Sequence, residues 1–440
     1  MSKSIAYWSI TVAIAGFLFG FDTAVISGAD KPLQSLWQTG DLFHGLFVMS
    51  AALWGTVLGA LFGNWPCERY GRRKVLIGIG LLYLISAMGS ALASDPYSFS
   101  LWRFIGGLAV GTSSIAVPAY ISEIAPPAAR GRLVALYQFQ IVFGILVAFF
   151  SNFLLSGLLS LGWRWMLGVE AIPALIYLLL VARVPESPRW LLLHKDDENE
   201  SRRIFRLIDP DTVDQTINHI RVTQQRFTDD RLLQRTYLWP VLLAFFLAAF
   251  NQLSGINFVI YFAPRIFELA GLDNSSALLS TAGIGLVNLA FTMLGIWLID
   301  RAGRKTLLLM GSIGYIASLA AISWAFNIDA NGLLVVLFVF VFIASHAIGQ
   351  GAVIWVFIAE IFPNNVRTKG QSLGCGTHWV LAALITLLMP HLLSLYDGQT
   401  IFGFFAGMMI LQLLFVSFVL PETKGKSLES LAMTGVIRTD

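Results

Sequence analysis

Residues 123–132 read EIAPPAARGR, and residues 360–369 read EIFPNNVRTK. The Glu, Ile, Pro and Arg of the first stretch recur 237 residues later in the second. Two further pairs follow in the same order: residues 68–74 (ERYGRRK) with 300–305 (DRAGRK), and residues 185–189 (PESPR) with 421–425 (PETKG). Three matched pairs in one order are typical of an internal duplication, so the sequence predicts two homologous halves.

The composition is that of a membrane protein. Hydrophobic residues make up 56% of the 440 residues and charged residues only 12%, whereas a soluble protein has about 25% charged residues. A helix needs about 20 mostly apolar residues to cross a bilayer. Twelve runs fit this length: Ala6–Gly28, Phe43–Trp65, Val75–Ala93, Ser98–Tyr120, Leu133–Leu155, Trp165–Val184, Leu238–Ala263, Ala277–Ile299, Thr306–Phe326, Leu333–Ile358, Ser372–Leu393 and Thr400–Leu420.

Six runs fall in each half. We therefore predict an all-α membrane protein with twelve transmembrane helices in two pseudo-symmetric six-helix bundles, residues 1–184 and 238–421. Residues 185–237 form a polar cytoplasmic linker with short amphipathic helices, and residues 422–440 form a short cytoplasmic tail. Two bundles around one central site are the arrangement of transporters that work by alternating access.

The distribution of Lys and Arg predicts the orientation, because cytoplasmic loops carry an excess of these residues. With the N-terminus in the cytoplasm, only Lys31, Arg103, Arg164 and Arg265 of the 29 basic residues lie on the outer side or in the outer half of the membrane. Both termini are therefore predicted to be cytoplasmic. The net charge of +3 reflects this topology and does not indicate binding to nucleic acid.

No pattern typical of an enzyme is present. The sequence has no Gly-rich phosphate loop, no His/Cys set with metal-ligand spacing and no nucleophile motif. The two cysteines, Cys67 and Cys375, lie in different halves and give no disulfide framework. We predict no enzymatic activity, no cofactor and no metal.

Three charged residues lie inside predicted spans of the first half. Asp22 lies sixteen residues into the first span, about 24 Å along its axis. Arg103 and Glu170 each lie five residues into spans that run the opposite way, so all three share one depth. Ionisable groups inside a membrane indicate function. Burial favours the protonated form of a carboxyl group and a neighbouring Arg favours the ionised form, so such a group can exchange a proton.

Neutral polar and aromatic residues also lie within the spans. Amides match the hydroxyl groups of a sugar, and aromatic rings match its C–H faces, without the cost of desolvating an ion. The same residues also occur as bonds between helices or as interface anchors. The residues in question are Gln138, Asn251, Gln252, Asn257, Asn288, Trp355, His378 and Trp379.

Five motifs resemble those of the sugar porter family of the major facilitator superfamily. They are residues 20–28 (GFDTAVISG), 103–107 (RFIGG), 185–191 (PESPRWL), 252–257 (QLSGIN) and 421–425 (PETKG), and the resemblance covers nearly the whole chain. It is strongest to bacterial proton-coupled pentose and hexose symporters. The resemblance implies a monomeric proton–monosaccharide symporter of the bacterial inner membrane. Its partners would be a small neutral sugar, protons and the lipid bilayer.

The resemblance also implies roles for single residues. Asp22 matches the proton-coupling carboxylate and Arg103 its partner, with Glu170 as a secondary candidate. Ile145, Asn251 and His378 match positions of the family's sugar site but depart from the family pattern. The sequence therefore does not decide whether the substrate is a pentose, a hexose or a polyol. The positions that match the family's sugar contacts or cavity aromatics are Phe19, Gln138, Gln252, Asn257, Tyr261, Asn288, Trp355 and Trp379.

Charged residues at the predicted cytoplasmic ends match a gate that the family closes with ion pairs. Carboxylates and guanidinium groups near helix ends can form bidentate pairs. The arginines of this set could instead act only in determining the orientation of the chain in the membrane. The residues are Arg72, Arg73, Glu123, Arg130, Arg304, Glu360 and Arg367.

Three other functions compete with symport. An uncoupled sugar uniporter does not need the carboxyl group of Asp22. A polyol or inositol porter would bind similar hydroxyl groups. A non-transporting sugar sensor usually has a long cytoplasmic tail, whereas only nineteen residues follow Pro421.

Overall fold

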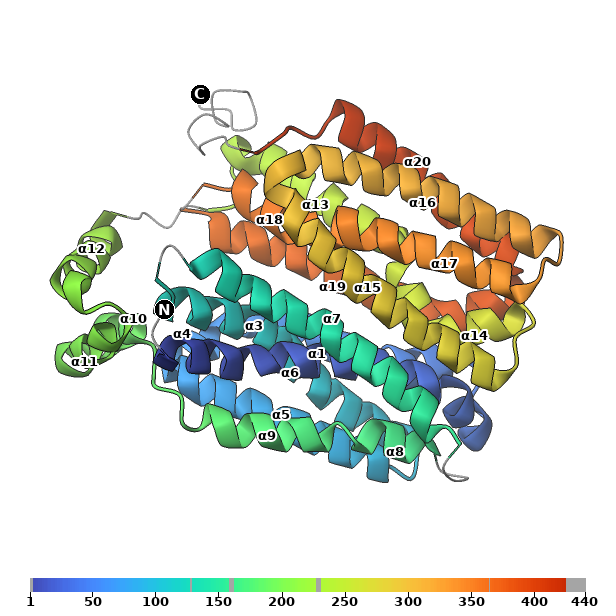
Figure 1. Ribbon diagram of the computed structural model, residues 1–440, viewed down its shortest axis with the longest axis horizontal. Helices are drawn as coiled ribbons and strands as arrows, with labels where there is room; N and C mark the ends of the chain where they lie inside the picture. Colours follow the sequence, from blue (N-terminus) through green and yellow to red (C-terminus); the bar gives the residue numbers. More distant parts are fainter. Residues whose placement is uncertain (1–2, 127–128, 158–161, 227–230, 364, 425–440) are drawn as a thin grey trace. The chain divides into compact units, whose positions relative to one another are not determined.

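The computed structural model describes residues 3–126, 129–157, 162–226, 231–363 and 365–424. Every regular element in these ranges is a helix (Figure 1). Eleven helices in these ranges are long and apolar enough to cross a membrane. A twelfth span is present if Asp41–Met49 and Ala51–Phe62, which meet at 44°, count as one bent helix. The predicted all-α membrane fold is confirmed. The predicted tail lies outside the described residues after Lys424.

The chain forms two compact units. Unit 1 contains Met1–Thr23, Ala51–Ile145 and Arg164–Thr228. In this unit α6 packs along both α3 and α5, and α5 also packs against α9. The helices that contribute to unit 1 are α1 (Lys3–Trp37, first part), α3 (Ala51–Phe62), α4 (Asn64–Tyr70), α5 (Arg72–Leu92), α6 (Pro96–Ile124), α7 (Arg130–Leu155, first part), α8 (Gly162–Gly168) and α9 (Ala171–Val181).

The linker of unit 1 contains the short amphipathic helices that the sequence predicts. Figure 1 shows α10 to α12 beyond the ends of the long helices of this unit. A small core of Leu192, Phe205, Val213, Ile217 and Ile220 holds them together. The elements are α10 (Pro188–Trp190), η2 (Leu191–Lys195), α11 (Glu198–Ile208), η3 (Pro210–Thr212) and α12 (Val213–Arg226).

Unit 2 contains Ala24–Ser50, Leu146–Trp163 and Asp229–Asp440. It therefore includes two segments that precede the repeat boundary seen in the sequence. One of them, η1 (His44–Met49), packs on α19 (Arg367–Leu395). The other elements are the last parts of α1 and α7, α2 (Asp41–Phe43), η4 (Arg235–Tyr237), α13 (Leu238–Leu253), α14 (Ile256–Leu269), α15 (Asn274–Ala302), α16 (Arg304–Asn327), α17 (Gly332–His346), η5 (Ala347–Gly351), α18 (Ala352–Ile361) and α20 (Gly398–Phe418).

Several long helices begin at a polar cap that precedes the predicted apolar run. The side chains of Asp95, Asp273, Asn331 and Asp397 accept hydrogen bonds from backbone N–H groups in the first turns of α6, α15, α17 and α20. Asp and Asn are favoured at this position because they satisfy N–H groups that have no partner within the helix. These helices therefore start a few residues before the hydropathy of the sequence indicates.

Helices α5 and α16 begin at equivalent corners of the two repeats. Gly71 and Gly303 precede them with φ of 91° in both cases, a conformation that favours glycine. A Cβ atom would lie 2.3 Å from a carboxylate oxygen of Glu186 at the first corner, and 2.7 Å from one of Glu422 at the second. Each glycine thus makes room for a glutamate that caps the helix.

The two capping glutamates have opposite pKa shifts. Burial raises the pKa of Glu186 above its usual value, although backbone N–H groups of Ser187 and Arg73 donate to it. Burial also acts on Glu422, but the backbone N–H groups of Arg304, Lys305 and Lys424 outweigh it and hold its pKa below the usual value. The surroundings of Glu422 therefore favour the ionised carboxylate, and those of Glu186 do not.

Candidate functional site

Asp22 and Arg103 form a buried ion pair in unit 1. Arg103 Nη1 donates to Asp22 Oδ1 at 2.5 Å, and Nη2 donates to the backbone carbonyl of Asp22 at 2.9 Å. Asp22 is 1% exposed and Arg103 is 2% exposed. Removal of Arg103 would leave the Asp22 carboxylate without its counterion and away from water, which is strongly unfavourable.

Glu170 is a second buried carboxyl group in the same unit. It lies between α8 and α9, and its Oε1 accepts no hydrogen bond from the described residues. It is close enough to interact electrostatically with both Asp22 and Arg103. Two carboxyl groups therefore lie within electrostatic reach of one guanidinium group, and the three groups together are neutral only when they hold one proton. A buried cluster with this charge balance is a candidate proton site.

A break between α13 and α14 shapes an amide cluster in unit 2. Gly255 lies in the break with φ of 83°, which favours glycine, and a Cβ atom there would lie 2.8 Å from the ring of Phe405. Gln252 precedes the break and Asn257 follows it. Asn257 Nδ2 donates to Gln252 Oε1 at 2.9 Å, and Gln252 Nε2 donates to Asn251 Oδ1 at 3.1 Å.

His378 joins this amide cluster to two aromatic rings. Gln252 Nε2 lies 3.1 Å from each ring nitrogen of His378. The His378 ring centroid lies 5.0 Å from that of Trp355 and 4.8 Å from that of Trp379. Polar groups beside aromatic faces are what a sugar site needs.

The remaining predicted sugar contacts are distributed over both units. Tyr261 is buried in α14, and Asn288 in α15 accepts a hydrogen bond from Thr292 Oγ1 at 3.3 Å. Phe19, Gln138 and Ile145 belong to unit 1, where Phe19 and Ile145 are buried and Gln138 is half-buried. The structure thus joins six predicted residues of unit 2 directly: Asn251, Gln252, Asn257, Trp355, His378 and Trp379.

The predicted gate residues form one ion pair at each corner. Arg72 Nη2 donates to Glu123 Oε1 at 2.9 Å in unit 1. In unit 2, Arg304 donates to both carboxylate oxygens of Glu360, at 2.8 Å and 3.1 Å.

The other three predicted gate residues do not take part in these two ion pairs. Arg73 donates to the carbonyl of Ala182 at 2.6 Å, and Arg367 donates to that of Phe362 at 3.3 Å. Arg130 is exposed and makes no ion pair within the described part of the chain.

Sequence reasoning missed a buried charged cluster around Asp30 in unit 2. His44 Nε2 lies 2.9 Å from Asp30 Oδ1, and Arg265 Nε lies 3.0 Å from Asp30 Oδ2. Arg265 also bonds Gln34. The rule that marked Asp22 would have marked His44, which lies inside the second predicted span, whereas Arg265 served only as a marker of orientation.

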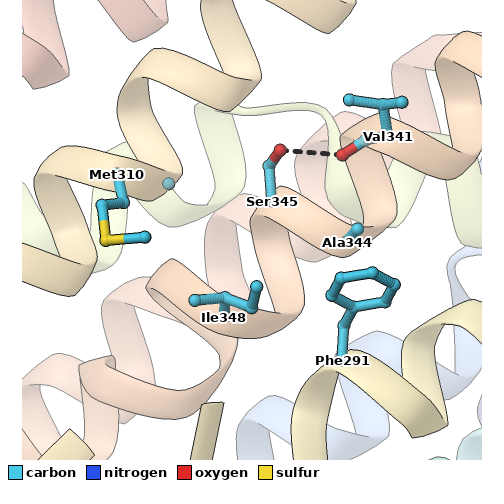
Figure 2. Close-up of a pocket in the computed structure, with 7 residues that line it drawn as sticks. Phe291, Met310, Val341, Ala344, Ser345 and Ile348 are labelled. Atoms are coloured by element: carbon cyan, nitrogen blue, oxygen red, sulfur yellow. Dashed lines mark hydrogen bonds between the residues drawn. The ribbon is translucent and has the colours of Figure 1, made fainter. Parts of the chain in front are cut away.

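A cavity of about 310 Å³ in unit 2 is separate from these residues. Figure 2 shows it between Phe291, Met310, Val341, Ser345 and Ile348. Ser345 supplies the only polar side chain of the lining, and its hydroxyl donates to the carbonyl of Val341 at 2.7 Å. Such a lining has no free polar group for a sugar.

Comparison with known proteins identifies the family. Residues 8–433 match the family model described as "Sugar (and other) transporter". The chain belongs to this transporter family. It is a multi-pass membrane transporter, and the family and its relatives are transporters rather than enzymes.

Curated relatives of this transporter match along nearly their full length. The D-xylose-proton symporter of Escherichia coli strain K12 is 32% identical, over 96% of this chain and 94% of the relative. The arabinose-proton symporter of Bacillus subtilis is 34% identical, over 96% and 93%. The glucose transport protein of Synechocystis is 34% identical, over 98% and 97%.

Solved structures agree with this assignment. The inward open structure of the xylose transporter XylE from E. coli has a TM-score of 0.87 at 31% identity, covering 98% of this chain and 99% of that one. The structure of the proton:xylose symporter XylE bound to 6-bromo-6-deoxy-D-glucose has a TM-score of 0.81 at 32% identity, with the same coverage. That symporter is a protein of the major facilitator superfamily.

Proposed function

We propose that this transporter is a proton–monosaccharide symporter that works by alternating access. The observation that carries the proposal is the buried ion pair of Asp22 and Arg103, with the buried carboxyl group of Glu170 within electrostatic reach of both. A cluster that is neutral only with one proton bound can couple the movement of that proton to a change of conformation. The names of the xylose and arabinose relatives, both proton symporters, support the same reading.

The substrate is a small neutral sugar, either a pentose or a hexose. The amides of Asn251, Gln252 and Asn257, beside the rings around His378, carry no formal charge and so suit an uncharged ligand. Further contacts come from residues that match the family motif: Phe19, Gln138, Ile145, Tyr261 and Asn288.

The transporter acts as a monomer in the bacterial inner membrane, with both termini in the cytoplasm. The distribution of Lys and Arg supports this orientation. The ion pairs Arg72–Glu123 and Arg304–Glu360 then lie on the cytoplasmic side, where they form the gate together with Arg73, Arg130 and Arg367.

Uptake into proteoliposomes tests the proposal. Labelled D-xylose, L-arabinose, D-glucose and myo-inositol are supplied with and without an imposed pH gradient. We expect accumulation of one monosaccharide only with the gradient, and its loss in Asp22→Asn, which still exchanges sugar across the membrane. Asp30→Asn changes another buried aspartate paired with an Arg, and should keep gradient-driven uptake. Accumulation by Asp22→Asn that still follows the pH gradient would show the assignment to be wrong.

An uncoupled uniporter is the second candidate, since the glucose relative is named only as a transport protein. It requires equal final sugar concentrations on both sides of the membrane, whatever the pH difference. Uptake of myo-inositol in preference to the monosaccharides would instead indicate a polyol porter.

A further inference from the structure

A row of buried hydrogen bonds extends from the amide cluster to α16. Asn251 Nδ2 donates to Gln350 Oε1 at 3.5 Å, and Gln350 Nε2 donates to Gln412 Oε1 at 3.0 Å. Gln412 Nε2 donates to Ser312 Oγ at 2.8 Å, and Ser312 Oγ donates to the carbonyl of Leu308 at 2.7 Å. These four polar side chains are at most 1% exposed. Sequence reasoning did not single out Gln350, Gln412 or Ser312.

The row has a fixed direction, and Ser312 sets it. The only hydrogen of the Ser312 hydroxyl goes to a backbone carbonyl, so its oxygen must accept from a neighbour. Gln412 therefore turns its NH₂ group toward Ser312 and its carbonyl toward Gln350. A primary amide has one donating end and one accepting end, so the orientation of each amide dictates that of the next.

The same direction continues into the candidate sugar site. Asn251 donates to Gln350, and its carbonyl accepts from Gln252. The carbonyl of Gln252 in turn accepts from Asn257, while its NH₂ group also faces His378. Every amide from Asn257 to Gln412 thus points the same way, and polarisation along such a chain strengthens each bond.

The π-helical turn η5 presents Gln350 to this row. It covers Ala347–Gly351, between α17 and α18, and Trp355 lies one turn further along α18. π-helical turns are rare and occur mostly at functional sites. An apolar residue at position 350 would avoid the cost of burying an amide, so the presence of Gln350 calls for a role.

We propose that Ser312, Gln412 and Gln350 are positioning residues that fix which end of each site amide faces the sugar, and that they thereby set the preference for particular sugar hydroxyls. This inference rests on the proposed function. Without the anchor, the amides of Asn251 and Gln252 can rotate by half a turn and exchange donor for acceptor. A sugar hydroxyl can both donate and accept, so the parent sugar still binds, but the penalty for a missing hydroxyl becomes smaller.

Competition by deoxy sugars tests the proposal. The readout is inhibition of counterflow by D-glucose and by 2-deoxy-, 3-deoxy- and 6-deoxy-D-glucose, or by D-xylose and its deoxy analogues if xylose competes better. In the wild type, one missing hydroxyl should weaken binding by about tenfold, the value of one well-formed hydrogen bond. Asn251→Ala identifies which ring position depends on the amide row.

Ser312→Ala is the decisive variant, and Ser312→Thr is its matched control because it keeps the hydroxyl. We expect Ser312→Ala to reduce the penalty at the Asn251-dependent position to about twofold, with the penalties at other positions and the maximal rate unchanged. Ser312→Thr should retain the full penalty. Gln412→Met keeps the side-chain volume and should behave like Ser312→Ala. If Ser312→Ala does not fold, Gln412→Met becomes the variant that tests the role of the amide row.

Two results would overturn the inference. One is an equal loss of affinity for every sugar in both variants, which a purely structural role would produce. The other is an unchanged penalty at the position defined by Asn251→Ala. Failure of the proposed function looks different, because the wild type itself would then show no sugar competition or no response to a pH gradient.

Discussion

The two repeats share their corners but differ in their cores. At each corner a glycine of φ 91° precedes a helix, a glutamate caps that helix, and an arginine pairs with a second glutamate. Unit 1 holds a charged cluster around Arg103, whereas unit 2 holds an uncharged row of amides in addition to the charged group around Asp30. The two repeats thus share the parts that shape the helix ends and differ in the polar groups of their cores.

The corners also differ in how fully their polar atoms are satisfied. Arg304 bonds both oxygens of Glu360, and Thr423 donates to the same carboxylate at 2.6 Å. At the first corner, Glu123 Oε2 and Arg72 Nε have no hydrogen-bond partner among the described residues. The second corner is therefore the stronger of the two, because bidentate pairs between Arg and a carboxylate are the firmest kind.

The largest effect is expected from Arg103→Leu, which breaks the charged core of unit 1. Two carboxyl groups would stay buried without their counterion, at a cost of about 3–5 kcal/mol in the free energy of unfolding. Lower pH should restore part of the loss, because protons then replace the guanidinium group. Thermal unfolding in detergent at pH 7.5 and pH 5 measures both effects.

The double variant Asp22→Asn/Arg103→Leu is the control for this prediction. It removes the charge that Arg103 neutralises, so it should be more stable than Arg103→Leu alone. Equal stability of the single and double variants would show that the ion pair is not what holds α1 and α6 together.

A smaller effect should separate the two corners. Glu360→Gln loses a bidentate pair, and we expect about 2 kcal/mol of destabilisation. Glu123→Gln loses a single hydrogen bond, and about 1 kcal/mol is expected. Thermal unfolding of the two variants side by side gives the difference, and a larger loss in Glu123→Gln would contradict the comparison.

The smallest effect concerns the two caps and depends on pH. A carboxyl group with a raised pKa, as in Glu186, favours folding below the usual value of 4.5 and loses that contribution as the pH rises through its folded pKa. Glu422 has a lowered pKa, so it favours folding above 4.5 and loses that contribution as the pH falls through its folded pKa.

At pH 7, Glu186→Gln should therefore keep or slightly raise the Tm, whereas Glu422→Gln should lower it. Near pH 4 the deficit of Glu422→Gln relative to the wild type should shrink. Melting curves of both variants at the two pH values provide the test, and a deficit of Glu422→Gln that grows on acidification would refute the assigned shift.

The fold could be predicted from the sequence because the apolar runs indicate the transmembrane helices and the repeated motifs indicate the two halves. It missed where several helices begin and end, because caps such as Asp95 and Asp273 are polar and lie outside the apolar runs. It also predicted α1 over Ala6–Gly28, whereas the helix continues to Trp37 through Pro32. In this extension Ala29, Asp30 and Leu33 are buried, whereas Lys31, Pro32, Ser35 and Leu36 are exposed. Hydropathy does not reveal that a helix continues beyond its apolar run.

The candidate site was predicted in part. Asp22, Arg103 and the residues of the QLSGIN motif stand out because charge or a motif marks them. Gln350 and Gln412 are single amides in apolar helices, and only their partners in space reveal a row. The pairing of Glu123 with Arg72 rather than with the nearby Arg130 also depends on how α5 packs against α6.

The π-helical turn at Ala347–Gly351 makes this part of unit 2 tolerant of one particular change in length. A π turn holds about one residue more than an α turn, so the extra residue is absorbed within the turn. Deletion of a single residue here would restore a regular α-helix and leave Trp355 directed toward His378. The same deletion between the turn and Trp355 would rotate Trp355 by about 100°, the angle that each residue advances an α-helix.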